Sequence, residues 1–302
     1  MATAAWSLAT IATPTGAVAC IEAGDKLYAL APSLARVGVP GVSEIIDLFA
    51  DWDASLAALD RAVGQLSSGD IVAGGRLSPL LYPGKVLCAG ANYFDHLAEM
   101  GMPGAKKADQ RLFFFMKPAR NAVVGEGDTV CMPIATQAFD WEIELAAVIG
   151  KRARNVSVED AMSYVAGYTV AIDFSARDHN RAAETFYKLD WVAGKANDTC
   201  CPLGPRLVPA RAIANPQDIG LKLSVNGATK QDGRSTDMIF SIAEQISIAS
   251  RIMTLDPGDV LLTGTPAGVG APKQTFLSVG DRVEASIEGI GTLAVRIQPA
   301  NG

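Results

Sequence analysis

From Tyr82 onward the chain consists of short apolar runs separated by glycine and proline, and this pattern limits the fold more than any other feature. The runs include KVLCAG, AAVIG, YTVAID, LKLSVNG and DVLLTGTP. Runs this short, bounded by turn residues, are typical of β-strands rather than helices. We therefore predict a β-rich α+β fold in which two helices, at 158–166 and 236–253, interrupt the strands.

The first 78 residues differ from the rest and are predicted to form a small N-terminal α/β domain, with 79–302 as the main domain. Strands at 16–22 and 26–31 flank the turn Gly24-Asp25, which predicts a hairpin. A helix is predicted over 43–65 from its apolar spacing. The polar segment SSGDIVAGGRLSP then links the two parts.

Composition excludes several classes of function. The 302 residues carry a net charge of −6 without a basic stripe, so nucleic acid is not an expected partner. No apolar run approaches the roughly 20 residues of a membrane span. The five cysteines form no CxxC pair, which argues against a disulfide framework or structural zinc. Without the basic start of a signal peptide, a cytoplasmic enzyme is expected.

Three acids form a candidate metal site. Glu142 and Glu144 lie in WEIELAAVIG, and alternate side chains of a strand share one face. Asp173 ends the apolar run AGYTVAI, where a buried acid is costly unless it is paired or bound to a metal. Three oxygen ligands favour Mg²⁺, Mn²⁺ or Ca²⁺ over zinc. The alternative is a strand with an acidic outer face and an aspartate that caps the next turn.

A second motif, GANYFDHLAEMG, carries a candidate acid–base pair. If Asp95 begins a short helix, His96 and Glu99 share a helix face at i and i+3, so the glutamate can orient the imidazole. An ordinary surface pair would have the same spacing. The following segment, GMPGAKKADQ, is rich in glycine and charge, as expected of a mobile lid.

Two further motifs offer ligand contacts. GKANDT places Lys195 and Asp198 in a loop, where the lysine could stabilise an enolate or be an ordinary solvated charge. LDPGDVLLTGTPAGVG places Thr265 at a strand end among glycines, which let the backbone approach a ligand closely. The spacing of a phosphate-binding loop is absent.

Taken in order, these motifs resemble the fumarylacetoacetate hydrolase family over roughly Tyr82–Gly289. The matching pieces are GANYFDHLAE, FFMKP, FDWEIELAAVIGKRARNVS, AGYTVAIDFSARD, GKANDTCCPLGP, SVNG and LDPGDVLLTGTPAGVG. The resemblance implies a mixed β-sandwich roll and a homodimer. It also implies that Glu142, Glu144 and Asp173 bind Mg²⁺ or Mn²⁺.

The same resemblance implies roles for the other residues. It assigns His96 and Glu99 as the catalytic pair that activates water, and Lys195 and Thr265 to the surroundings of the substrate oxygens. The remaining residues assigned to the substrate pocket are Arg177, Lys117, Asp198 and Tyr93. The chain departs from the family where SARDHN replaces SARDxQ, at His179 and Asn180, and where the segment 181–191 is longer.

A function follows from the metal site and the pair together. A 2-oxo acid can chelate a divalent metal, which stabilises the enolate left when its C3–C4 bond breaks. We predict hydrolysis of a 2,4-dioxo acid of the acylpyruvate type to pyruvate and a carboxylic acid. The alternatives are a decarboxylase or isomerase of an oxo-dicarboxylate, and a catalytically silent protein that binds a keto acid.

Overall fold

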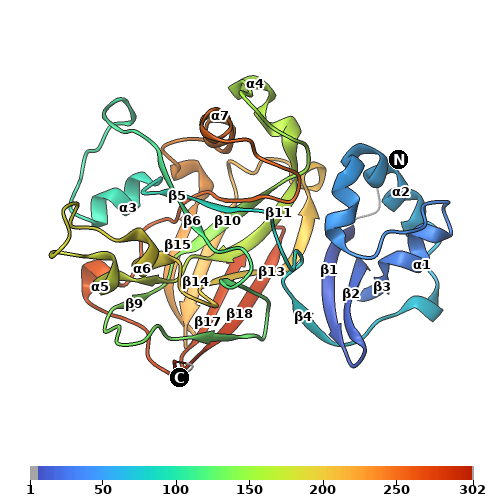
Figure 1. Ribbon diagram of the computed structural model, residues 1–302, viewed down its shortest axis with the longest axis horizontal. Helices are drawn as coiled ribbons and strands as arrows, with labels where there is room; N and C mark the ends of the chain where they lie inside the picture. Colours follow the sequence, from blue (N-terminus) through green and yellow to red (C-terminus); the bar gives the residue numbers. More distant parts are fainter. Residues whose placement is uncertain (1–5, 301–302) are drawn as a thin grey trace.

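Two β-sheets and several short helices make up residues 6–300, the part of the chain that this computed structural model describes (Figure 1). The strands of the larger sheet are β1 (Trp6–Thr13), β2 (Gly16–Ala23), β3 (Lys26–Ala29), β4 (Gly75–Leu77), β5 (Val86–Gly90), β6 (Phe113–Lys117), β7 (Val123–Val124), β10 (Ile143–Ile149), β11 (Val165–Ile172), β13 (Cys201–Pro209) and β16 (Val260–Leu262). They run in the order β3-β2-β1-β13-β11-β10-β16-β5-β6, with β4 paired to β1 and β7 to β13.

The smaller sheet has five strands, and two short strands pair apart from both sheets. Its members are β8 (Thr129–Cys131), β14 (Gly220–Val225), β15 (Ala228–Arg234), β17 (Arg282–Ile287) and β18 (Gly291–Gln298), in the order β15-β14-β17-β18-β8. The separate pair is β9 (Phe139–Asp140) with β12 (Ser175–Ala176). The predicted β-rich α+β fold is confirmed.

The helices are short and lie around the sheets. The α-helices are α1 (Leu30–Ala35), α2 (Trp52–Val63), α3 (Phe94–Glu99), α4 (Val158–Ala161), α5 (Arg177–Asn180), α6 (Trp191–Lys195) and α7 (Ile242–Ile252). The 3₁₀ turns are η1 (Ile45–Asp51), η2 (Ser68–Asp70), η3 (Lys107–Asp109), η4 (Met162–Tyr164), η5 (Ala210–Ala212), η6 (Ser235–Asp237) and η7 (Ala271–Lys273). No helix within 6–300 is both long enough and apolar enough to cross a membrane.

Each predicted helix is shorter in the structure than in the sequence analysis. The helix predicted over 43–65 is divided into η1 and α2, because Asp51 accepts a hydrogen bond from the Ala54 N–H and starts a new helix. The helix predicted over 158–166 ends before β11, which begins at Val165. The helix predicted from 236 begins instead at Ile242, after Ser241, which forms a capping box with Glu244.

Two cores lie on opposite faces of the larger sheet. Ile143 and Leu145 of β10 pack with Leu223 and Val283 of the smaller sheet on one face. On the other face, Ala146 joins a second cluster with residues of the N-terminal part. Because β10 and β11 are buried on both faces, both strands are almost entirely apolar in sequence, and Glu144 is the one charged residue in them.

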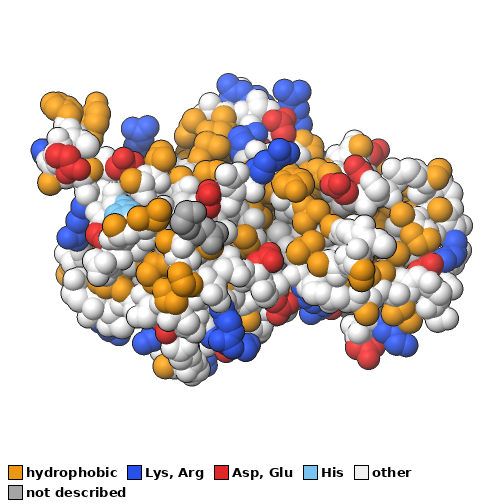
Figure 2. Space-filling model, turned by 60° about the horizontal axis from the view of Figure 1, so that its bottom comes forward, with side chains coloured by type: hydrophobic (Ala, Val, Ile, Leu, Met, Phe, Trp, Pro, Cys, Tyr) orange, Lys and Arg blue, Asp and Glu red, His pale blue; other side chains and the backbone are white. Residues whose placement is uncertain are grey.

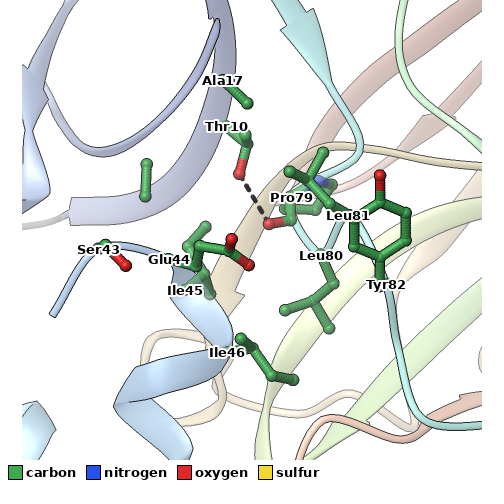
Figure 3. Close-up of a pocket in the computed structure, with 11 residues that line it drawn as sticks. Thr10, Ala17, Ser43, Glu44, Ile45, Ile46, Pro79, Leu80, Leu81 and Tyr82 are labelled. Atoms are coloured by element: carbon green, nitrogen blue, oxygen red, sulfur yellow. Dashed lines mark hydrogen bonds between the residues drawn. The ribbon is translucent and has the colours of Figure 1, made fainter.

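The N-terminal strands form the lobe on the right of Figure 1 and extend the larger sheet. The hairpin of β2 and β3 is confirmed, and β1, which the sequence analysis missed, joins it to β13 through the pair Leu8–Leu207. The chain then crosses to the main part through Pro79–Tyr82. Figure 3 shows this segment beside Thr10, whose hydroxyl donates to Pro79 O over 2.9 Å, around a small cavity of about 80 Å³.

The segment between α5 and α6 projects from the molecule at the left of Figure 1. A bridge between Arg181 and Leu189 closes it into a hairpin. Phe186 and Tyr187 pack edge to face at its tip and are 89% and 83% exposed. In Figure 2, hydrophobic side chains gather at the protruding tip on the left, while acidic and basic side chains both occur across the face that is shown.

Candidate metal centre and catalytic pair

The three predicted acids meet at the ends of two neighbouring strands. Glu144 lies on β10, and Glu142 directly precedes this strand. The Asp173 N–H donates to Glu142 O over 2.8 Å, so these two residues are cross-strand neighbours just beyond β11. All three carboxylates are buried, and one oxygen of each lies within 4.8 Å of the others. The alternative of an acidic outer face is therefore wrong.

Strand alternation explains why they converge. Ile143 and Leu145 pack into the core under the smaller sheet, so Glu142 and Glu144 point to the opposite face of the strand. Ile172 packs into the same core as Ile143, which leaves Asp173 on the side of the two glutamates. A one-residue shift of either strand would break up the cluster.

Lys195 lies inside this cluster. Its Nζ is 2.7 Å from Glu142 Oε2 and 2.7 Å from Asp173 Oδ2, and its side chain is 5% exposed. Residues 191–195 form α6, whose start is capped by Asp190. The solvated surface charge considered for Lys195 is therefore excluded, because the ammonium group bridges two of the three acids.

Arg177 holds the cluster from another side. Its guanidinium lies 2.6 Å from Glu142 Oε1 and 2.9 Å from Asp140 Oδ2. Asp140 is fully buried and also accepts hydrogen bonds from the N–H groups of Gly270 and Ala271. This arrangement links one carboxylate oxygen of Glu142 to the buried Asp140 through Arg177.

The two glutamates have opposite electrostatic surroundings. Burial alone raises the pKa of Glu142, but Lys195, Arg177 and then His96 outweigh it and hold this pKa well below its usual range. Burial, together with the charges of Asp173 and Glu142, raises the pKa of Glu144 well above its usual range. The surroundings therefore favour the charged form of Glu142 and the neutral form of Glu144.

Lys117 is the deepest cation of the site. It donates hydrogen bonds to the carbonyl oxygens of Phe174, Lys195 and Cys200, at 2.9, 2.6 and 2.9 Å. An ammonium group has three protons, so these bonds use all of them. Asp173 Oδ1, 2.7 Å from Lys117 Nζ, is attracted by the charge but receives no hydrogen bond.

The residues present fit a divalent cation. Asp173 Oδ1 is a buried carboxylate oxygen that accepts no hydrogen bond, and a cation beside Glu144 would favour the charged carboxylate that burial and the neighbouring acids disfavour. The donor set is three carboxylates with no sulfur and no nitrogen, which suits Mg²⁺, Mn²⁺ or Ca²⁺.

His96 and Glu99 form the expected pair on α3. His96 Nδ1 lies 2.8 Å from Glu99 Oε1, and His96 is 7% exposed. The surface pair considered as an alternative is therefore wrong. Asp95 does not cap this helix as predicted, because the cap position is Tyr93. Its carboxylate instead accepts hydrogen bonds from the N–H groups of His96 and Ala267.

One loop, residues 264–271, connects the acids with the pair. Its successive N–H groups point to four carboxylates. Gly264 N–H donates to Glu144, Ala267 to Asp95, Gly268 and Val269 to Glu99, and Gly270 and Ala271 to Asp140. The loop therefore links Glu144 of the carboxylate cluster with the His96–Glu99 pair in one candidate site.

The other residues predicted to line the substrate pocket lie in different environments. Tyr93 is fully buried, and its hydroxyl has no partner among the described residues; burial raises its pKa well above the usual value. Thr265 donates its hydroxyl proton to Ile143 O over 2.8 Å, so the proton is not free for a ligand. Asp198 is exposed and lines a separate cavity of about 420 Å³ with His179.

Two buried residues of the site, Gln231 and Asp140, were not predicted from the sequence. Gln231, on β15, contacts both β10 and the loop 264–271. Asp140 holds Arg177 and the end of that loop. Asp140 directly precedes the WEIELAAVIG motif and could have been singled out as a third acid there, whereas Gln231 gives no such signal.

The two-sheet fold and the buried carboxylates beside a His–Glu pair define a β-rich enzyme with a site that can hold a divalent metal. The chain belongs to the fumarylacetoacetate hydrolase family, because residues 85–298 match the family model of the fumarylacetoacetate hydrolase C-terminal domain. The family predicted from the motifs is thus confirmed, as is the fold predicted with it.

Three similar proteins illustrate the range of this family. A mitochondrial oxaloacetate tautomerase of Xenopus laevis is 41% identical over 240 residues, covering 79% of this chain and 72% of the relative. A fumarylacetoacetate hydrolase from Exiguobacterium antarcticum superposes with a TM-score of 0.79 at 29% identity, covering 98% and 100% of the two chains. A fumarylpyruvate hydrolase from Pseudomonas aeruginosa, solved with Mn²⁺ and pyruvate, has a TM-score of 0.64 at 36% identity, covering 71% and 89%.

Proposed function

We propose that the protein is a divalent-metal-dependent enzyme that hydrolyses a 2,4-dioxo acid of the acylpyruvate type to pyruvate and a carboxylic acid. The observation that carries this proposal is the His96–Glu99 pair, 2.8 Å apart and joined to the carboxylate cluster through the loop 264–271. The Pseudomonas aeruginosa hydrolase supports it, because that protein was solved with Mn²⁺ and pyruvate.

The cation is assigned to Glu142, Glu144 and Asp173. A divalent ion bound there would polarise a 2-oxo acid as a Lewis acid, and we expect this ion to be Mg²⁺ or Mn²⁺. Lys195 and Arg177 hold two of these carboxylates in place. Their positive charges also offset part of the negative charge of these carboxylates.

The pair supplies the base. His96 Nδ1 faces Glu99, so an Nδ1–H donated to that carboxylate leaves the lone pair of Nε2 free to accept a proton. His96 takes a proton from water, and the hydroxide oxygen forms a bond to the C4 carbonyl carbon of the substrate. The C3–C4 bond then breaks, its electron pair stays on C3 of the pyruvate enolate, and a proton returned to C3 completes pyruvate.

A second candidate function is tautomerisation of oxaloacetate. The relative from Xenopus laevis, 41% identical, favours it. Tautomerisation needs proton transfer at the same enolate but no attacking water, so the same His96 could perform it. Decarboxylation of oxaloacetate would produce CO₂ instead.

One set of assays separates these reactions. Acylpyruvates are tested for release of pyruvate, and oxaloacetate for enol–keto conversion by ultraviolet absorbance and for release of CO₂. We expect pyruvate release that EDTA abolishes and Mn²⁺ restores. Rapid oxaloacetate conversion with no acylpyruvate cleavage would favour the tautomerase, and metal binding without any turnover would favour the silent binding protein.

The histidines provide a matched pair of variants, since the chain has two. We expect His96→Ala to lose hydrolysis by about 10²–10⁴-fold, the range for a general base. His179→Ala removes an imidazole from the separate cavity and should keep most of kcat. Full activity in His96→Ala would contradict the assigned base.

A further inference from the structure

A fully buried glutamine, Gln231, lies between the two sheets where the larger sheet loses a strand. β16 pairs with β10 only from Ala146 to Val148. At the residues of β10 before Ala146, β16 no longer runs alongside. The backbone groups that point to that side of β10 would therefore lack partners. These groups belong to Leu145 and to Ile143, the residue between Glu142 and Glu144.

The backbone N–H of Thr263 and the side chains of Thr263, Thr265 and Gln231 replace the missing strand. The N–H and hydroxyl groups of Thr263 both donate to Leu145 O, at 3.1 and 2.8 Å. The hydroxyl group of Thr265 donates to Ile143 O at 2.8 Å. Gln231 Oε1 accepts from Ile143 N–H at 2.9 Å. Both polar groups of the Ile143 backbone are therefore held, although β16 does not reach this residue and only β11, on the other side, lies beside it.

Gln231 also fixes the orientation of Thr265, the other side chain that bonds to the Ile143 backbone. Its Nε2 donates to Thr265 Oγ1 and to Pro266 O, both at 2.8 Å. A hydroxyl group that accepts from Gln231 must turn its own proton elsewhere, and that proton goes to Ile143 O. One amide thus orients Thr265 and anchors the loop 264–271 against the strand that carries two of the acids.

We propose that Gln231 is a positioning residue for the metal site, which acts through Ile143 and Thr265 to hold Glu142 and Glu144 at the spacing that a cation requires. This inference rests on the metal site of the proposed function but not on which reaction the site performs. Hydrogen bonds behind metal ligands commonly change metal affinity by about 10–100-fold.

The test is the dissociation constant of Mn²⁺ alone, measured by isothermal titration calorimetry, for Gln231→Leu. We expect binding to weaken at least about tenfold. Gln217→Leu is the matched control, because Gln217 also bridges two backbone groups, Ser235 O and Ile242 N–H, but makes no contact with β10. It should lose thermal stability and keep its Mn²⁺ affinity within about twofold.

Two further measurements exclude a purely structural effect. Hydrogen exchange at the Ile143 amide should accelerate in Gln231→Leu and not in Gln217→Leu. Thr265→Val should weaken Mn²⁺ binding as well, and the double variant should be little weaker than Gln231→Leu, since both residues act on the same backbone. If Gln231→Leu folds poorly, Gln231→Glu keeps an acceptor for Ile143 and removes the donors.

The outcomes are distinct. Mn²⁺ affinity equal in Gln231→Leu, Gln231→Glu and the unchanged protein overturns the positioning role. No Mn²⁺ binding by the unchanged protein overturns the metal site and this inference with it. Mn²⁺ binding without acylpyruvate cleavage overturns only the proposed hydrolysis and leaves the role of Gln231 to be decided by the affinities.

Discussion

Lys117 Nζ lies 2.7 Å from Asp173 Oδ1, and neither side chain is exposed to solvent. Burial alone lowers the pKa of Lys117, but Asp173 and the neighbouring cysteine thiols together outweigh it and raise this pKa above the usual value. The ammonium group therefore stays charged and supports both the acid and three carbonyl oxygens of the surrounding chain.

We expect Lys117→Met to destabilise the protein by about 3–5 kcal/mol, because it leaves a buried carboxylate and three carbonyls without their cation. Urea unfolding measures the change. Lys151→Met is the control, since Lys151 lies 2.7 Å from Asp53 in an exposed pair and should cost less than about 1 kcal/mol. Equal effects of the two substitutions would show that burial of the pair does not matter.

Mn²⁺ should raise the thermal midpoint of the protein, and EDTA should remove the increase. At 100 times its dissociation constant, a ligand that binds only the folded state adds about 2.7 kcal/mol. Glu142→Gln should lose most of this gain because it removes one ligand charge. Glu22→Gln alters a buried carboxylate that is bound by Arg76 instead, so its Mn²⁺-induced shift should persist.

Glu99→Gln tests the catalytic pair. The loss of the carboxylate leaves His96 without its charged partner, and acylpyruvate cleavage should fall by about 10²–10⁴-fold at unchanged Mn²⁺ affinity. Asp95→Asn is matched to it, because Asp95 also accepts from the loop but does not contact the imidazole ring. A similar rate in both variants would argue against the pair.

Gly268→Ala should be more harmful than Gly280→Ala. Both glycines have positive φ, +108° and +95°, so alanine costs about 1–2 kcal/mol of strain at either. A Cβ at Gly268 would also lie 2.1 Å from Lys230 O, whereas the one at Gly280 meets nothing within 4 Å. We expect only Gly268→Ala to lose activity beyond its loss of stability, because the Gly268 N–H holds Glu99.

The segment after α3 is tied down by an ion pair that depends on pH. Lys107 Nζ lies 2.6 Å from Glu244 Oε1. Burial raises the pKa of Glu244, but hydrogen bonds from Lys107 and Ser241 outweigh it and lower the pKa below 4.5. The ion pair therefore stabilises the folded protein fully above the usual pKa of a glutamate. This stabilisation is lost as the pH falls through the lowered pKa of Glu244.

Hydrogen exchange over 100–110 measures the effect of this ion pair at pH 7. Lys107→Ala should speed exchange there by about two- to fivefold, as expected of an exposed pair, and high salt should mimic it. Lys106→Ala changes the neighbouring lysine, which makes no ion pair in the described residues, and should have little effect. Identical exchange in both variants would contradict a role for the pair in holding residues 100–110.

Sequence patterns predicted those parts of the site that depend on residues close together in the chain. Strand alternation placed Glu142 with Glu144, and helical spacing placed His96 with Glu99. Lys195 was predicted as a loop residue near substrate oxygens, but its ammonium group bridges two acids. That contact depends on how β10, β11 and α6 come together, which a linear pattern does not contain.

Long-range contacts account for most of what was missed. Gln231 is 88 positions from Ile143, and no spacing rule connects them. The join between β1 and β13 likewise links distant parts of the chain. The long segment 181–191 was recognised, but its exposed aromatic tip was not. The domain boundary after residue 78, the homodimer and the cytoplasmic location stay predictions.

The loop 264–271 has a consequence for altering this enzyme by design. Because it serves Glu144, Asp95, Glu99 and Asp140 at once, a change within it cannot retune one function and spare the others. Attempts to redirect substrate choice should therefore leave this stretch intact. The hairpin between α5 and α6 is the better place for variation, since its tip can be rebuilt without disturbing any of those four carboxylates.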